Sequence, residues 1–224
     1  MEAIFLLDTS CSMRGARINQ LNHAMYDILT ELDSIDDGSN EKISVRIVSF
    51  NNVAKFILGD EKNSVRVDKA RDQWINLVPR GATDSAHATR LCANSILHDY
   101  QNGNKDKTIV VLVTDGKSSD HERFIEEIKS LKKSLSGIAD KTVLLASVGV
   151  QDYDEGELYE FATSGVATLD GGKTTQSTYL VYKIDNLSTL NYAFKQIFDT
   201  KLEFISIDDI YEMVIEESAD DEDW

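Results

Sequence analysis

Cysteine, proline and long apolar stretches are scarce in this 224-residue chain, which has two cysteines and one proline. Cys11 and Cys92 do not have the C-x-x-C spacing of a zinc site, and nothing in the sequence supports a disulfide between them. No apolar stretch is long enough to span a membrane, so we expect no membrane association. Met1 is followed at once by an apolar run, which leaves no room for a signal peptide. We therefore expect a cytoplasmic protein.

Positively charged residues are also few. The chain has 23 Lys and Arg residues and 39 Asp and Glu residues, which give a net charge of −16. Such a protein repels the phosphates of DNA and RNA, so we expect no nucleic-acid partner. A chain of this length suits one large α/β domain, which we place at residues 1–203. Residues 204–224 are predicted to be a C-terminal extension with a solvated tail, since 216–224 are almost wholly acidic.

Short apolar runs alternate with helical patterns along the chain. Apolar runs at 3–7, 109–113 and 142–150 are typical of buried parallel strands. A strand ending at Phe50 is followed by a turn and a returning strand, and a final strand is expected at 179–184. Helical periodicity marks residues 18–32, 84–100, 120–135, 157–163 and 187–202. This order predicts an α/β fold, a doubly wound and mostly parallel sheet with one antiparallel edge strand and helices on both faces.

Side chains with oxygen atoms follow the first apolar run at every second position. They belong to Asp8, Ser10 and Ser12. In open α/β sheets ligands bind at the carboxyl ends of the strands. Three oxygens that converge there can hold a hard cation such as Mg²⁺. The alternative interpretation is that these side chains only cap the helix that follows.

Two later segments favour the cation site. Asp115 follows another buried run in the sequence T-D-G, and Thr83 lies in the turn G-A-T-D between the two runs. A D-x-S-x-S motif followed by such a Thr and Asp resembles the von Willebrand factor type A (VWA) family, which includes integrin I-type domains. The chain departs from the usual family wording at Cys11, where Gly is frequent, and at Ala82, which replaces the second Gly of G-G-T. Neither departure removes a ligand oxygen. A narrower and weaker similarity is to the bacterial TerY-like stress-associated group.

The resemblance implies a metal-ion-dependent adhesion site (MIDAS) formed by Asp8, Ser10, Ser12, Thr83 and Asp115. In this family the serines contact the metal directly, the aspartates often act through water, and the threonine enters or leaves the coordination shell. The implied cofactor is Mg²⁺ or Mn²⁺, and the implied partner is a protein that supplies a Glu or Asp carboxylate. We therefore expect a binding module, in a stress or signalling complex. We do not expect an enzyme, because no nucleophile is accompanied by a base.

Other interpretations compete with this one. Residues 167–174 match a loosened Walker A pattern that ends in Gly172, Lys173 and Thr174, as in P-loop nucleotide hydrolases. A P-loop must open a helix, whereas the residues after Thr174 look like a strand. A haloacid-dehalogenase-type phosphatase would need a second Asp where Ser10 stands. A VWA scaffold that binds its partner without metal remains open. His87 is near Thr83 in sequence, although an ordinary polar helix position explains it equally well.

Overall fold

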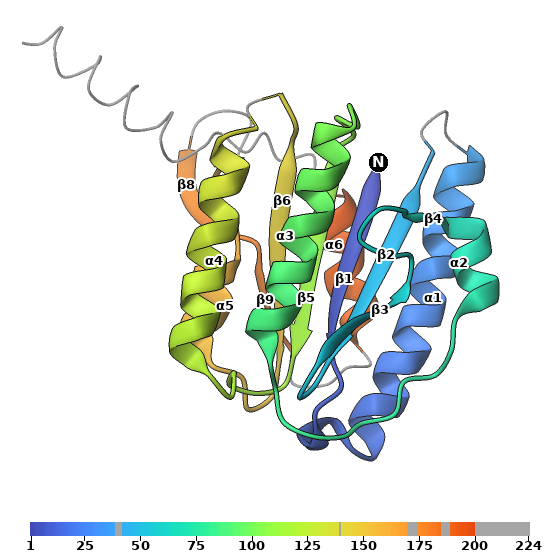
Figure 1. Ribbon diagram of the computed structural model, residues 1–224, viewed down its shortest axis with the longest axis vertical. Helices are drawn as coiled ribbons and strands as arrows, with labels where there is room; N and C mark the ends of the chain where they lie inside the picture. The colour runs from blue at the N-terminus through green and yellow to red at the C-terminus, as the bar shows by residue number, and fades with distance from the viewer. Residues whose placement is uncertain (39–41, 139, 170–173, 185–188, 200–224) are drawn as a thin grey trace, which may run out of the picture.

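A seven-stranded sheet with helices on both faces is the framework of the computed structural model (Figure 1). The structure describes residues 1–38, 42–138, 140–169, 174–184 and 189–199. The strands of the sheet are β1 (Glu2–Asp8), β2 (Ser44–Phe50), β3 (Ala54–Leu58), β4 (Val65–Arg66), β5 (Thr108–Thr114), β6 (Val143–Val150) and β9 (Val181–Ile184). Their spatial order is β3-β2-β1-β5-β6-β9, and β4 also pairs with β2.

The helices follow the strands in the alternation that the sequence predicts. They are α1 (Ala16–Gly38), α2 (Val67–Gln73), α3 (Ser85–Gln101), α4 (His121–Ser136), α5 (Glu155–Phe161) and α6 (Leu190–Asp199), with a short 3-10 helix η1 (Cys11–Met13) before α1. A separate two-stranded antiparallel sheet is formed by β7 (Ser164–Leu169) and β8 (Thr174–Tyr179).

Strand β1 shows why the sheet needs helices on both faces. Its side chains alternate between two buried cores, because successive residues of a strand point to opposite sides. Ala3, Phe5 and Leu7 pack in a core with residues of α1, α2 and α6. Ile4 and Leu6 pack in a second core with residues of α3, α4 and α5. All five side chains are inaccessible to solvent, which explains the uninterrupted apolar run.

The predicted fold class is confirmed, with differences at the edges of the sheet. Strands β2, β1, β5, β6 and β9 are parallel, and β3 returns antiparallel to β2 as expected. Strand β4 is a second antiparallel partner of β2 that the sequence did not predict. The predicted strand at 179–184 is two strands, because the chain leaves β8 at Tyr179 and enters the main sheet at Val181.

The ends of the long elements agree closely with their sequence signals. Asp84 caps α3 and Asp120 caps α4 through their side chains, and Gly137 ends α4. The part of the predicted 187–202 helix that is described forms α6. The predicted extension at 204–224 lies outside the described residues. No helix among the residues described is long and apolar enough to cross a membrane.

Candidate metal centre

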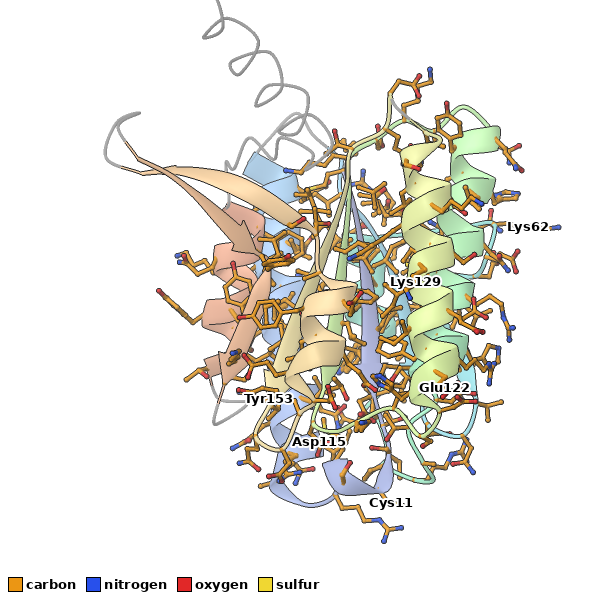
Figure 2. The ribbon with its side chains drawn as sticks, turned by 90° about the vertical axis from the view of Figure 1, so that its left-hand side faces the viewer. Cys11, Lys62, Asp115, Glu122, Lys129 and Tyr153 are labelled. Carbon is orange, nitrogen blue, oxygen red and sulfur yellow. The ribbon has the colours of Figure 1, made fainter. Side chains whose placement is uncertain are left out.

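The predicted site lies at the carboxyl ends of two neighbouring strands. Asp8 is the last residue of β1, and Asp115 directly follows β5. These strands pair in parallel with Leu7 opposite Val113, so two carboxylates far apart in the sequence come to the same edge of the sheet. Figure 2 shows Asp115 and Cys11 at this end of the molecule. The loop from Asp8 to Ser12 and the loop after β5 therefore form one constellation.

Asp8 is completely buried beneath the loop that follows it. Its Oδ1 accepts a hydrogen bond from the backbone N–H of Ser10 at 2.8 Å, and its Oδ2 accepts one from the Thr114 hydroxyl at 2.7 Å. Burial raises the pKa of Asp8 to about 6, although the hydrogen bonds from Ser10 and Thr114 lower it; the nearby charge of Asp115 adds a smaller increase. The buried carboxylate thus fixes the loop and lacks a full counter-charge.

The two serine hydroxyls form a chain that ends on the second carboxylate. The Oγ atoms of Ser10 and Ser12 are 2.8 Å apart, and the Ser12 hydroxyl donates to Asp115 Oδ1 at 2.6 Å. Because a hydroxyl has one proton, Ser10 donates to Ser12, and lone pairs on both oxygens remain. Ser10 is buried, whereas Ser12 is exposed, so the chain runs from the interior to the surface. The predicted ligands Ser10, Ser12 and Asp115 are therefore in direct contact.

Thr83 is held between the loop after β1 and the loop after β5. Two residues earlier, the Gly81 carbonyl accepts a hydrogen bond from Cys11 N–H at 2.9 Å. On the other side, Thr83 N–H donates to Ser119 Oγ at 2.9 Å, and the Thr83 carbonyl accepts from Ser119 N–H at 2.8 Å. Ser118 adds a longer hydroxyl contact to the same carbonyl. The backbone of Thr83 is thus held directly by the loop after β5, while Gly81 in the same turn is held by the loop after β1, and Thr83 itself is buried.

The two departures from the family wording are accommodated by the backbone. Gly81 has φ +72°, and a Cβ there would clash with the side chain of Asn52, so glycine is strongly favoured at this position. Ala82 and Cys11 do not have positive φ angles. Ala82 N–H instead donates to the same Asn52 oxygen. Cys11 begins the short helix η1, so a side chain at this position causes no strain and its sulfur is exposed.

Arg17, at the start of α1, is a member of the site that the sequence analysis missed. Its Nη1 donates to Asp115 Oδ2 at 2.5 Å, and its Nη2 contacts Gln151 Oε1 and lies 3.3 Å from Asp152 Oδ2. The hydrogen bond to Asp115 raises the pKa of Arg17 above its usual value. No sequence motif singles out this arginine, since its partners come from β5 and β6. Thr114 was also missed, although it stands in the quoted T-D-G.

The donor set suits a small hard cation. Hydroxyl and carboxylate oxygens are the ligands that Mg²⁺ and Mn²⁺ prefer. Among the described residues, no three His, Cys, Asp or Glu side chains are grouped so as to hold an ion by themselves. A site here therefore depends on the hydroxyls of Ser10 and Ser12, with the carboxylates of Asp8 and Asp115 supplying the negative charge. Thr83 is connected to the loop after β5 through its backbone.

The competing sequence interpretations find less support. Gly172 and Lys173 lie outside the described residues, and Thr174 begins strand β8 rather than a helix. The sequence after the Walker-like pattern thus lacks the helix that would face phosphates. His87 Nδ1 accepts a hydrogen bond from Ala54 N–H at 3.2 Å. That contact gives His87 a structural role, because it attaches α3 to the start of β3.

Solved structures with this fold include several VWA proteins. A von Willebrand factor type A protein from Catenulispora acidiphila is 16% identical with a TM-score of 0.61, and the match covers 87% of this chain and 41% of that one. Proximal thread matrix protein 1 from the mussel byssus, described with a zinc-occupied MIDAS motif, is 18% identical with a TM-score of 0.59, covering 88% and 44%. The ArnB paralog VWA2 from Sulfolobus acidocaldarius is 19% identical with a TM-score of 0.53, covering 86% and 43%.

These likenesses concern the fold, and the chain spans less than half the length of each of the three proteins. The family assignment rests on the sequence itself. The sequence model of the von Willebrand factor type A domain matches residues 3–196, which include every residue of the candidate site. The chain therefore belongs to the von Willebrand factor type A family.

Proposed function

We propose that this protein is a metal-dependent binding module that captures an acidic side chain of a partner protein. VWA domains mediate protein binding, so the family supports the general class of function. One observation carries the finer proposal: the Ser10 and Ser12 hydroxyls form a hydrogen-bonded chain to Asp115 beside the buried Asp8. Such a chain of neutral oxygens next to buried negative charge is suited to a divalent cation at the protein surface.

In this proposal the hydroxyls of Ser10, Ser12 and Thr83 hold Mg²⁺ or Mn²⁺, and the carboxylates orient them. Asp8 and Asp115 already accept hydrogen bonds from Ser10 N–H and from the Ser12 hydroxyl, so they fix the loop and its oxygens. A cation with mostly neutral ligands stays electrophilic and can accept a partner's Glu or Asp carboxylate. The zinc-occupied MIDAS described for the mussel protein supports the idea that this fold can hold a cation there.

The surface beside the site also favours a protein partner. The connector between α2 and α3 exposes three quarters of Ile75 and of Val78. A cavity of about 460 Å³, lined among others by Thr9, Trp74 and Leu77, lies next to this connector. Arg80 N–H donates to the Thr9 carbonyl at 2.8 Å, which joins the connector to the metal-site loop. Apolar side chains next to a cation site allow a partner to bury apolar surface around its acidic residue.

We propose no catalytic activity for this site. The Ser12 hydroxyl donates to a carboxylate that is already paired with Arg17, so neither serine is positioned against a free base. The P-loop alternative is disfavoured by strand β8 at Thr174. Binding of a partner without metal remains the second candidate. We also propose a cytoplasmic location, and a role in a stress or signalling complex that rests on the TerY-like resemblance.

Isothermal titration with Mg²⁺ and Mn²⁺ tests the metal site. Asp8→Asn keeps the shape of the side chain and removes its charge, so we expect metal affinity to fall by about 10- to 100-fold. Glu2→Gln is the matched control, because Glu2 is an equally buried acid at the opposite end of β1. The control should bind metal like the wild type. Equal affinity in wild type and Asp8→Asn would contradict the site.

Partner capture is tested with protein from the native host in Mg²⁺ or in EDTA. Retention on the wild type should require Mg²⁺. Thr83→Ala should reduce retention more than it reduces metal affinity, if Thr83 approaches the ion only when a carboxylate is bound. Comparison of the chain with and without residues 216–224 tests whether the acidic tail of a neighbouring molecule acts as a surrogate ligand for the site. Equal retention in EDTA would favour the metal-independent alternative.

A further inference from the structure

Arg17 already occupies part of the environment that a divalent cation would use. Both oxygens of Asp115 are engaged, Oδ1 by the Ser12 hydroxyl and Oδ2 by Arg17 Nη1. The same guanidinium nitrogen also lies 3.3 Å from the Ser12 carbonyl. The Asp115 carboxyl group is fully buried, whereas a quarter of the Arg17 side chain is exposed. Arg17 therefore supplies a positive charge to a buried carboxylate from the solvent side.

The other end of the guanidinium is held by the loop after β6. Its Nη2 contacts the side chains of Gln151 and Asp152. Gln151 has φ +58° and is the only non-glycine residue with positive φ among those described. This conformation is unfavourable for a residue with a side chain, and such strain is retained where a site requires it. Gln151 N–H also donates to the Ile184 carbonyl at 3.1 Å, so the loop is anchored to β9.

We propose that Arg17 is a built-in competitor of the divalent cation, tethered by Gln151 and Asp152. The inference rests on the metal site of the proposed function and adds a control on its affinity. Arg17 occupies an acceptor position of Asp115 Oδ2 and neutralises part of the negative charge that would attract a cation, so cation and guanidinium compete for this carboxylate. The contacts with Gln151 and Asp152 keep the released guanidinium nearby, so it can return when the ion leaves. Metal binding is thereby linked to the loop between β6 and α5.

The contacts argue against the simpler idea that Arg17 directly grips a partner's carboxylate. Both terminal nitrogens already have acceptors, one on Asp115 and Ser12 and the other on Gln151 and Asp152. A guanidinium with its terminal donors engaged offers little to a new anion. A positive charge a few ångströms from a divalent cation, in contrast, disfavours the cation wherever solvent screening is incomplete.

The test is isothermal titration of Mg²⁺ and Mn²⁺ into the wild type, Arg17→Gln and Arg14→Gln. Arg14 is exposed in the same loop region and makes no ion pair with any described residue, so its replacement changes net charge equally without changing the contacts of Asp115. Arg17→Gln should bind Mg²⁺ about tenfold more tightly than the wild type. Arg14→Gln should differ from the wild type by less than about twofold, because exposed charges are screened.

Each outcome supports or overturns the competitor role of Arg17. Metal binding by Arg17→Gln that is only as tight as in the wild type, or weaker, overturns the competitor role and leaves the metal site standing. An equal gain in both variants also overturns it, since long-range charge would then suffice. Binding by Arg17→Gln but not by the wild type supports it. Absence of Mg²⁺ and Mn²⁺ binding in the wild type and both variants overturns the proposed metal function and this inference together.

Discussion

The two ends of β1 carry similar groups in different surroundings. Each end brings buried acidic side chains and an arginine together. Arg46 contacts both Glu2 and Asp99 at the amino end, whereas at the carboxyl end Arg17 pairs with Asp115, and Asp8 is held by hydrogen bonds from Ser10 and Thr114. Arg46 is buried, donates to both oxygens of Asp99 at 2.7 and 2.9 Å, and contacts Glu2 directly.

The difference lies in how completely the arginine is enclosed. Arg46 Nε donates to the Asp60 carbonyl at 2.8 Å, so all three of its nitrogens have protein acceptors in a region without solvent. Arg17 is partly exposed, and the hydroxyls of Ser10 and Ser12 lie beside its carboxylate partner. An enclosed ion-pair cluster can hold secondary structure together. In a partly exposed cluster, a carboxylate can exchange its arginine for another cation. The comparison thus indicates a structural role for the amino end of the strand and supports the proposal that the carboxyl end is a binding site.

The largest effect should come from breaking the closed cluster. Arg46→Met leaves Glu2 and Asp99 buried without their cation, which should cost about 3–5 kcal/mol of unfolding free energy. Arg17→Met at the open end should cost less, about 1–2 kcal/mol in EDTA, because a quarter of the Arg17 side chain is exposed and Asp115 keeps its hydrogen bond from Ser12. Urea unfolding followed by circular dichroism measures both. Similar losses in the two variants would remove the proposed distinction between the ends.

Stability should depend on pH through both buried acids, in different windows. Burial raises the pKa of Glu2 to about 7, although Arg46 lowers it, and Asp8 has a pKa of about 6. A raised pKa means that the folded state holds the proton more tightly, so the stabilisation is complete below the usual pKa near 4 and is lost as pH rises. In EDTA, the wild type should therefore lose unfolding free energy between about pH 4 and 6, and Asp8→Asn should not. Above pH 6 the variant should be more stable than the wild type by on the order of 3 kcal/mol.

Glu2→Gln sharpens the same experiment from the other end of the strand. The stability advantage of Glu2→Gln over the wild type should keep growing up to about pH 7, one unit beyond that of Asp8→Asn. Thermal unfolding from pH 4 to 8 resolves the two windows. Addition of Mg²⁺ should reduce the advantage of Asp8→Asn over the wild type but leave that of Glu2→Gln unchanged. If Mg²⁺ changed the advantage of both variants, or of neither, the result would contradict a metal site at the carboxyl end of β1.

Two glycines provide a smaller test of how tightly each end is packed. Gly81 and Gly103 both have positive φ, but only Gly81 has a neighbour, Asn52, where a Cβ would lie. Gly103→Ala, between α3 and β5, should cost about 1 kcal/mol from its backbone conformation alone. Gly81→Ala should cost about 1–2 kcal/mol more, because the Asn52 side chain must move. Equal losses of stability in the two variants, measured by thermal unfolding, would mean that the Asn52 side chain moves aside without cost.

The smallest effect on stability is expected for Ser12→Ala. The substitution removes one partly exposed hydrogen bond to Asp115, worth about 1 kcal/mol. Its metal affinity should nevertheless fall about tenfold, since a candidate ligand is lost. Thr108→Val is the control at the amino end, where it removes a hydroxyl contact of 3.3 Å to the Asp106 carbonyl. Calorimetric titration of the control should match the wild type.

The sequence predicted those parts of the molecule whose signal is local. The apolar runs of β1 and β5 are buried on both faces, and D-x-S-x-S with Asp115 marks the strand ends where the site lies. Helix α2 was missed because it is seven residues long and buries only Val67 and Ala70, too few for a helical period. Strand β4 has two residues and cannot show alternation.

Arg17 was missed for a different reason. An arginine in the first turn of an amphipathic helix is ordinary in composition, and its role depends on residues that follow β5 and β6, about 100 and 135 residues away along the chain. The distinction between Arg17 and Arg14 requires knowing which of them faces Asp115. Ion pairs of this kind depend on how the strands pack against a helix, and they cannot be predicted from a single sequence.

Strand β1 also sets the distance over which its two ends can influence each other. Glu2 and Asp8 are six residues apart along an extended chain, or about 20 Å at the rise of a strand. The charges that shift each pKa are near neighbours, Arg46, Asp99 and Lys141 for Glu2 and Asp115 for Asp8. The two acids should therefore titrate as independent groups, and the free-energy changes of Glu2→Gln and Asp8→Asn should add in the double variant. Substitutions at the carboxyl end of β1 should thus leave the stability of the cluster at its amino end unchanged.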